Sequence, residues 1–379
     1  MSTKSIFIGL LITFFFMGKC FSDYVDDILN GKKSLDSVVF EFYSSGKYSE
    51  LYEILEKLSE ATNSEKILFE KIKLGYSLGK GNVTNDIYEF LNSPSPNLIN
   101  LILVIGSDEK ILLGIGNFIT SKGISKNTLL NYSKMCLLNN SLKVLTAFLT
   151  NTTPPEELIN LYNEIIESLL QKLDYYQMYN EIVTIFYSYK SYIKFSEFER
   201  EIIANGLINL NKPDEALELI SNVDSANAII IRIKSLSMIG ELDSALEESK
   251  KLRITGINAR IVFLLFLNKL DLQSAKNTAV FLDESFRELS VGVISLMEGD
   301  IMKAEEVMKN ILSKSYFDPN IRNLSAELIW VVNNSSDIDE TKKLSLSILN
   351  RFAKIKNSNL ILGSEQVEKI KKLEGYSIP

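Results

Sequence analysis

The 379-residue sequence contains no histidine, only two cysteines and a single tryptophan. Without histidine the chain can form no Ser-His or Cys-His nucleophilic pair, no His-ligated zinc or haem site, and no imidazole pH switch. We therefore predict no catalytic residues, no cofactor and no metal site, and we expect a protein that is not an enzyme. A glycosidase acting on a cell wall or glycan is the catalytic alternative, because two distant carboxylates need leave no recognisable motif.

The sequence also lacks an excess of positive charge. Its 41 Lys and Arg residues are outnumbered by 48 Asp and Glu residues, which gives a net charge of −7. Nucleic-acid binding usually requires a basic surface that neutralises phosphates, so we predict no nucleic-acid partner. A protein or peptide partner is the expectation that remains.

Long apolar runs are missing as well, except at the amino terminus. There an apolar stretch from Ile6 to Gly18 follows Lys4 and is interrupted only by Thr13. This stretch fits the apolar region of a secretory signal and is shorter than the ~20 residues that span a bilayer. We predict that residues 1–22 are a signal peptide cleaved between Ser22 and Asp23, and that the protein is exported to the periplasm or cell envelope of a bacterium.

Two other interpretations of this segment place the protein on a membrane. Cys20 could carry a lipid, although Lys19 departs from the small residue that lipoprotein signals place before the cysteine. The apolar stretch could also stay uncleaved as an anchor. Once residues 1–22 are removed, Cys136 is the only cysteine left, so no intramolecular disulfide can form. Cys136 lies in an apolar string, and we predict a buried hydrophobic role for it.

Strand signals are scarce, whereas helix starts are frequent. Capping-box patterns occur at Thr62–Glu65, Thr153–Glu156, Ser196–Glu199 and Ser285–Glu288, and apolar residues recur at spacings of three and four. The stretch from Gly75 to Gly81 resembles a phosphate-binding loop, but it is one residue short and Gly81 stands where a Ser or Thr is required. We predict an all-α fold with a turn between helices at this stretch.

An internal repeat is the most informative feature of the second half. Four short segments contain a turn residue followed by an alanine, and these alanines are spaced by 29, 30 and 29 residues. An aliphatic residue follows each alanine seven positions later. The alanines are Ala216, Ala245, Ala275 and Ala304. This pattern predicts helical hairpins in series, with each alanine where two helices approach most closely.

The repeat resembles the tetratricopeptide-like helical-repeat family. Gly240 and Gly299 match its turn glycine, the four alanines match its packing alanine, and Ala204 and Gly292 match its small residue in the first helix. Ile233 and Phe263 depart from that small residue, and the period is shorter than the usual 34. The resemblance implies stacked antiparallel hairpins that bind peptides or partner helices in a groove lined by the first helices.

Weaker copies of the pattern cover the rest of the chain. Segments that begin at Gly46 and Ser336 repeat its spacing, and Gly81, Asn139 and Leu173 could begin further units. We predict an α-solenoid of about eight to ten hairpins. Its expected parts are a divergent repeat half over residues 23–199, tetratricopeptide-like repeats over 200–314, and a last repeat with capping helices over 315–379.

Two segments could form binding surfaces. Nine aromatic residues lie between Tyr175 and Phe198, and we single out Tyr187, Tyr189 and Tyr192 as candidate partner-binding residues, with packing between hairpins as the alternative. Residues 342–372 contain eight Lys and Arg against two acids. We interpret that segment as a solvated cap, with peripheral contact to membrane lipid or cell-wall polymer as the alternative.

These features together predict an exported, non-catalytic helical-repeat scaffold that mediates protein–protein interactions in the periplasm or cell envelope. A membrane-tethered envelope assembly factor, held by a lipidated Cys20 or by an uncleaved anchor, is the alternative.

Overall fold

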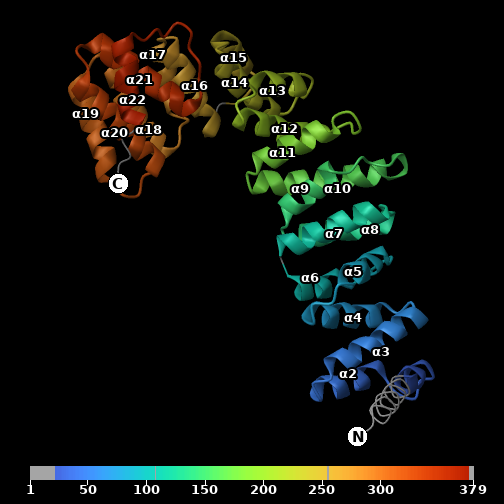
Figure 1. Ribbon diagram of the computed structural model, residues 1–379. Coiled ribbons are helices and arrows are strands. Elements are labelled where there is room, and N and C mark those ends of the chain that lie inside the picture. Colours follow the sequence, from blue (N-terminus) through green and yellow to red (C-terminus); the bar gives the residue numbers. More distant parts are fainter. Residues whose placement is uncertain (1–21, 107, 254–255, 375–379) are drawn as a thin grey trace. The chain divides into compact units, whose positions relative to one another are not determined.

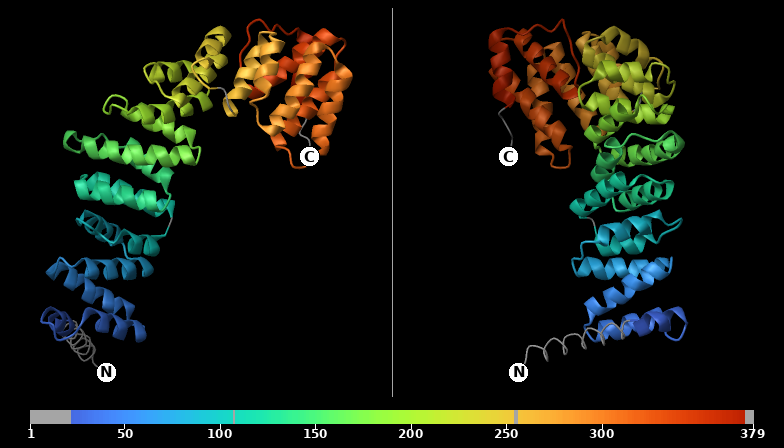
Figure 2. Two further views of the ribbon diagram at one scale, coloured as in Figure 1. Left: turned by 180° about the vertical axis from the view of Figure 1, so that it is seen from behind. Right: turned by 45° about the vertical axis from the view of Figure 1, so that its right-hand side comes forward.

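The computed structural model describes residues 22–106, 108–253 and 256–374, and over these ranges it contains helices, turns and bends but no strand. The chain divides into two compact units (Figures 1 and 2). Of the described residues, unit 1 comprises those between 22 and 176 together with 184–194, and unit 2 comprises 177–183 and those between 195 and 374. The prediction of an all-α fold is confirmed.

Unit 1 is a series of helices that follow one another in successive layers, as all views in Figures 1 and 2 show. Residues 22–29 are helical. The following helices are α2 (Leu35–Ser44), α3 (Tyr48–Ala61), α4 (Glu65–Ser77), α5 (Val83–Asn92), α6 (Leu98–Ile105), α7 (Glu109–Lys122), α8 (Lys126–Leu138), α9 (Leu142–Thr150), the 3₁₀ turn η1 (Glu156–Leu158), α10 (Ile159–Tyr175) and α11 (Tyr179–Tyr189), whose residues are divided between the units.

Unit 2 continues the same alternation of helix and short turn. Its helices are α12 (Glu197–Asn209), α13 (Pro213–Ile220), α14 (Ala226–Ile239), α15 (Leu242–Ser249), α16 (Ile257–Asn268), α17 (Leu272–Ala279), α18 (Glu284–Glu298), α19 (Ile301–Ser313), α20 (Pro319–Asn334), α21 (Ile338–Ala353) and α22 (Ser364–Glu374). In the part of the chain that the structure describes, helices α2 to α21 follow one another through short connections, and neighbours such as α12 and α13 or α18 and α19 pack together, which agrees with the predicted solenoid of hairpins.

A left-handed residue after the first helix creates most of the tight turns. Asn211, Gly240, Leu270 and Gly299 have φ values of 61°, 96°, 57° and 93°. In each case the next backbone N–H bonds the carbonyl five residues earlier, as Asp271 N bonds Phe266 O at 3.0 Å. This is the Schellman arrangement, which satisfies carbonyls at a helix end and reverses the chain. The four turns therefore share one geometry, although only two of them contain glycine.

The same turn occurs in unit 1, at Gly46 where the sequence pattern places it, but elsewhere at other positions than the pattern predicts. The left-handed residues are Gly46, Gly79 and Asn140, and not Gly81 or Asn139. Leu173 lies inside α10 and is fully buried, so it begins no repeat. The turn positions Gly81, Asn139 and Leu173 were predicted wrongly, since the left-handed residues nearest to them are Gly79, Asn140 and Gln177. The errors arise because the first half has no regularly spaced alanines that fix the turn positions. In the stretch from Gly75 to Gly81, residues 75–77 are the end of α4 and residues 78–81 form the expected turn between helices.

The four alanines of the repeat are all completely buried, and they lie on the second helices α13, α15, α17 and α19. A methyl group at this position lets the second helix pack closely against its partner, since a larger side chain would force the backbones apart. Of the four predicted capping boxes, only that of Ser196 and Glu199 forms. The predictions that begin at Thr62, Thr153 and Ser285 are wrong, since the N-cap residues are Ser64, Pro155 and Asp283.

Helix α21 departs from simple stacking in unit 2. It packs against α16, α18, α20 and α22. Asn350 on α21 exchanges two amide hydrogen bonds with Asn268 at the end of α16, with distances of 2.6 and 2.7 Å. The Phe352 ring stacks on Phe286 of α18 at 6.2 Å between centroids. One hydrophobic core therefore joins α14 to α22.

Candidate functional site

A polar groove lies on unit 1 across three successive helix pairs. It consists of two neighbouring hollows of about 910 and 550 Å³, which share Glu60, Lys71, Asn85 and Asp86. The walls come from α3, α4, α5 and α7. On α7 the lining residues follow the helical spacing of one face and include Asn117 and Lys122. We refer to the two hollows together as the α3–α7 groove.

A buried ion pair forms the floor of this groove. Lys71 Nζ lies 2.9 Å from Asp86 Oδ1, and the two side chains are only 10% and 6% exposed. Lys71 lies one helical turn after the buried Ile67, and Asp86 lies among the buried residues of α5, so both charges occupy core-facing positions. Burying two charges costs several kcal/mol per ion before their attraction is counted. The pair is therefore weak evidence for stability and better evidence for a site.

Two polar atoms beside the pair are buried without a hydrogen-bond partner. They are Asp86 Oδ2, the carboxylate oxygen that Lys71 does not bind, and the hydroxyl of Tyr52 on α3. Burial, with the nearby Asp86 charge as the second cause, raises the pKa of Tyr52 to about 12. The Tyr52 ring also requires a glycine at position 75, where a Cβ would lie 2.9 Å from Tyr52 Cε2. Of these two atoms, only the Asp86 carboxylate belongs to the lining of the groove, so the groove has an unpartnered acceptor at its base.

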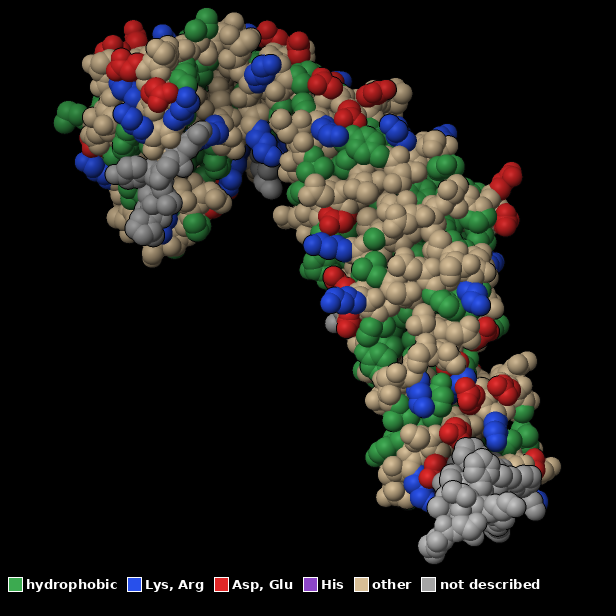
Figure 3. All heavy atoms as spheres, in the orientation of Figure 1, with side chains coloured by type: hydrophobic (Ala, Val, Ile, Leu, Met, Phe, Trp, Pro, Cys, Tyr) green, Lys and Arg blue, Asp and Glu red, His purple; other side chains and the backbone are tan. Residues whose placement is uncertain are grey.

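The groove is acidic. Its lining contains five carboxylates and two lysines, and one of these lysines is Lys71, which Asp86 already binds. The carboxylates are Glu56, Glu60, Glu65, Asp86 and Glu89. Figure 3 shows charged side chains of both signs gathered over α3 and α4, whereas polar and apolar side chains dominate the neighbouring helix pairs on the same face. The electrostatic potential in the groove favours a cationic ligand.

The predicted aromatic surface is only partly present. Tyr187 and Tyr192 are 37% and 50% exposed, whereas Tyr189 is 1% exposed. The Tyr189 hydroxyl donates a 2.6 Å hydrogen bond to the Leu149 carbonyl, and its ring packs against Tyr162. Tyr189 is therefore a core residue, and its prediction as a partner-binding residue is wrong. Lys190 lies 5.1 Å from the centre of the Tyr187 ring and covers part of that tyrosine.

The groove that the family resemblance implies is filled in unit 2. The first helices α14, α16 and α18 would line it, but α21 packs on α16 and α18, and Lys356 N donates a 2.8 Å bond to the Ser237 carbonyl on α14. The chain's own carboxyl-terminal segment covers these helices. In this region a partner therefore cannot lie along the first helices in the way that the resemblance implies.

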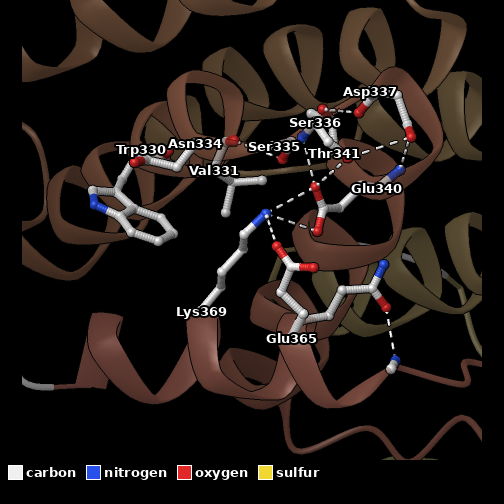
Figure 4. Close-up of polar contacts among 12 residues, drawn as sticks. Trp330, Val331, Asn334, Ser335, Ser336, Asp337, Glu340, Thr341, Glu365 and Lys369 are labelled. Atoms are coloured by element: carbon white, nitrogen blue, oxygen red, sulfur yellow. Dashed lines mark hydrogen bonds and ion pairs between the residues drawn. The ribbon is translucent and has the colours of Figure 1, made fainter.

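Part of the basic carboxyl-terminal segment is neutralised by acids (Figure 4). Lys369 on α22 bonds both carboxylate oxygens of Glu340 on α21 at 3.0 Å, and Glu365 lies 3.5 Å away. The backbone hydrogen bond from Ser336 and then the hydrogen bond from Lys369 hold the pKa of Glu340 below its ordinary value, and the Ser336 hydroxyl adds a smaller effect in the same direction. Arg351 and Lys371 also pair with acids. The lysine thus fastens α22 onto α21, as a cap requires.

Other predicted residues lie as follows. Cys136 is fully buried, and burial raises the pKa of its thiol to about 12, so it is a core residue and not a reactive thiol. Ser22 and Asp23 belong to the described helical residues 22–29, whereas Cys20 and the apolar stretch lie outside the described residues. Among the described residues, no helix is long and apolar enough to cross a membrane, and no group of three or more Cys, Asp or Glu side chains could hold a metal ion.

The sequence reasoning missed the α3–α7 groove. A signal for it was present: Lys71 interrupts the apolar face of α4, and Asp86 lies on the apolar face Val83, Ile87 and Phe90 of α5. A charged residue at a core position is rare unless it is paired. Two such residues of opposite sign on successive helices predict a buried pair.

Comparison with known proteins gives limited information. No family model matches this chain, and no curated protein matches it. The chain is similar to the solved structure described as the crystal structure of the P58(IPK) TPR domain, with 12% identity, 89% of this chain and 96% of that chain covered, and a TM-score of 0.24. At that TM-score the two backbones do not superpose as a whole.

The fold assignment consequently rests on this chain's own geometry: consecutive helices joined by short connections, Schellman turns, and buried alanines on the second helices. The architecture is tetratricopeptide-like. A tetratricopeptide-like solenoid exposes long surfaces that are suited to protein partners. In unit 1 the groove described above is such a surface, lined mainly by the second helices α3, α5 and α7.

Proposed function

We propose that the protein is an exported, non-catalytic helical-repeat scaffold that binds protein partners in the periplasm or cell envelope of a bacterium. The observation that carries this proposal is the α3–α7 groove. It is an open polar surface that spans three consecutive helix pairs and contains a buried charged pair at its base. Stacked hairpins commonly present extended surfaces of this kind to peptides.

Two observations support a binding role over a chemical one. The only lysine among the floor residues is engaged by Asp86, so it is not a free base or nucleophile. The groove is also open and wide, whereas two-carboxylate hydrolysis requires an acid and a base facing each other across one bond. Export is supported by the amino-terminal pattern of Lys4, the apolar stretch and the small residues before Asp23.

Chemical crosslinking in intact cells, followed by mass spectrometry of the purified protein, tests the scaffold proposal. We expect the same protein partner in repeated experiments, with crosslinks to lysines near the groove such as Lys122. A complete absence of reproducible protein crosslinks under conditions that capture other envelope complexes would require a different function.

The membrane-tethered alternative rests on Cys20 and the preceding apolar stretch. Fractionation after a carbonate wash, combined with mass spectrometry of the mature amino terminus, separates the two. The exported form predicts a soluble chain that begins at Asp23. A chain in the membrane fraction that begins at a lipid-modified Cys20, or retains Met1, would establish the tether.

A further inference from the structure

We propose that the α3–α7 groove binds a lysine or arginine side chain of a polypeptide partner, with Asp86 as the anchoring carboxylate. This inference deepens the scaffold proposal and rests on it, because it states which partner chemistry the groove recognises. It starts from an imbalance in the buried pair: Lys71 occupies Asp86 Oδ1, whereas Oδ2 is buried and has no donor.

A buried carboxylate oxygen without a donor is costly. A polar group that is taken out of water and left unpaired costs roughly 1–3 kcal/mol, and more when it is charged. A donor that reaches Asp86 recovers this free energy, and a cationic donor recovers the most because its hydrogen bond is charge-assisted. Guanidinium and ammonium groups both carry several N–H donors on a long chain, which suits a group at the base of a groove.

The surroundings select a cation over an anion. Lys71 is already neutralised, so the groove retains four further carboxylates against Lys122 alone. Glu56 and Glu60 lie one helical turn apart on α3 and therefore face the same hollow. A basic side chain that enters beside α3 passes these two carboxylates before it reaches Asp86. Because the carboxylates at the rim are met before the buried carboxylate of Asp86, the groove favours a long side chain with its charge at the tip.

The groove also offers groups for a peptide backbone. Asn82 and Asn85 on the α4–α5 turn and helix, and Asn117 on α7, line the hollow with amides that can donate and accept. All three are exposed and can therefore meet an incoming chain. Side-chain amides of this kind can bond the backbone of an extended peptide and so fix its position along the groove, without specifying its side chains. The carboxylates then supply the selectivity for Lys or Arg.

The test uses fluorescein-labelled tetra-arginine, tetra-lysine and tetra-glutamate peptides, with binding to the full chain followed by fluorescence anisotropy. We expect both basic peptides to bind and tetra-glutamate not to bind. Binding should weaken strongly between about 50 and about 300 mM NaCl, as electrostatic recognition requires. Equal binding of tetra-glutamate, or salt-independent binding of the basic peptides, would overturn the proposal.

Two variants with matched controls locate the site. Asp86→Asn removes the anchor charge and should weaken basic-peptide binding by about tenfold or more, whereas Asp36→Asn, an exposed Asp paired with Lys66 in the same unit, should leave it unchanged. Glu60→Lys reverses an exposed rim charge and should weaken binding by about tenfold. Glu53→Lys makes the same change at an exposed site of α3 outside both hollows and should have little effect.

Glu60→Lys keeps the test decisive if Asp86→Asn fails to fold. Equal affinity in Glu60→Lys and Glu53→Lys would place binding elsewhere and refute the proposal. In-cell crosslinking of the same variants separates this inference from the scaffold function. A partner captured equally by the wild type and Glu60→Lys leaves the scaffold function standing and removes the groove, whereas no captured partner in the wild type removes the scaffold function itself.

Discussion

The turn at Leu270 gives the sharpest test of the repeat geometry. Leu270 occupies the left-handed position that Gly240 and Gly299 occupy in the neighbouring repeats, with φ of 57°. Its side chain is 67% exposed, so little apolar contact would be lost on its removal. We therefore predict that Leu270→Gly stabilises unit 2, although it replaces a large apolar residue by the smallest one.

The magnitude follows from two opposing backbone terms. A non-glycine residue in the left-handed region costs roughly 1–2 kcal/mol, which glycine does not incur. Glycine in turn loses more conformational entropy on folding, by roughly 0.5–1 kcal/mol. The difference favours Leu270→Gly by about 0.5–1 kcal/mol. For a unit of roughly 150–250 residues this corresponds to a rise of about 1–4 °C in the midpoint of its thermal unfolding.

Differential scanning calorimetry of the full chain measures this shift, and two controls isolate its cause. Leu270→Ala removes the same apolar group but keeps the strained backbone, so its midpoint should stay close to that of the wild type. Gly46→Ala makes the reverse change in unit 1 at φ of 69°, where a Cβ would contact no atom within 4 Å, and should destabilise unit 1. A lower midpoint for Leu270→Gly, or an equal gain for Leu270→Ala, would refute the backbone argument.

Four further predictions follow from individual side chains and from the composition. Cys136 should react with Ellman's reagent only after urea unfolding, because burial raises its thiol pKa to about 12. Asp86→Ala should destabilise unit 1 by about 3–5 kcal/mol in urea titrations, whereas Lys71→Met combined with Asp86→Leu should cost less than Asp86→Ala, since no buried charge is left alone. Because the pKa of Glu340 is lowered in the folded chain, its carboxylate contributes stability at pH values above its ordinary pKa of 4.5, and this stability is lost as the pH falls through the folded pKa. The difference in thermal unfolding midpoint between the wild type and Glu340→Gln should therefore shrink below about pH 4.5. Basic-peptide affinity should change little between about pH 5.5 and 7, because histidine is the only side chain with an ordinary pKa in that range and the chain has none.

Much of the fold follows from local sequence patterns. The regular spacing of the four buried alanines located the four turns of unit 2, including those at Asn211 and Leu270, where no glycine marks the position. It succeeded because close helix packing requires a small residue at a fixed distance from the turn. In unit 1 large residues replace the alanine, so the register was lost and glycine alone misled: Gly81 was chosen although Gly79 makes the turn.

The error at Tyr189 has a geometric cause. Successive residues of an α-helix are separated by about 100°, so positions two apart lie about 200° from each other around the axis. Tyr187 and Tyr189 therefore cannot both face solvent on one helix, and the structure buries Tyr189. The large number of aromatic residues in this segment suggested a binding surface. Their spacing along the helix, however, already predicts that some of them face solvent and others face the core.

The position of α21 could not be predicted from any local pattern. It depends on contacts between residues that are far apart in sequence, since Asn268 bonds Asn350 and Asn357 across separations of 82 and 89 residues. An open solenoid and a covered one have the same local helices and the same turns. The difference lies in whether a later helix finds a complementary face, and here the Phe286–Phe352 stack and the paired amides provide it.

This covering bears on which face of a hairpin array binds a partner. A stacked hairpin offers two long surfaces, one from the first helices and one from the second. In unit 2 the first-helix surface already has an occupant, the segment from α21 to Lys356. In unit 1 the buried charges lie between α4 and α5 and open onto a groove lined mainly by second helices. The repeat family alone therefore does not say which face of this protein binds a partner, whereas the buried Lys71–Asp86 pair, with Asp86 Oδ2 left unpartnered in the α3–α7 groove, is the observation on which our proposal for unit 1 rests.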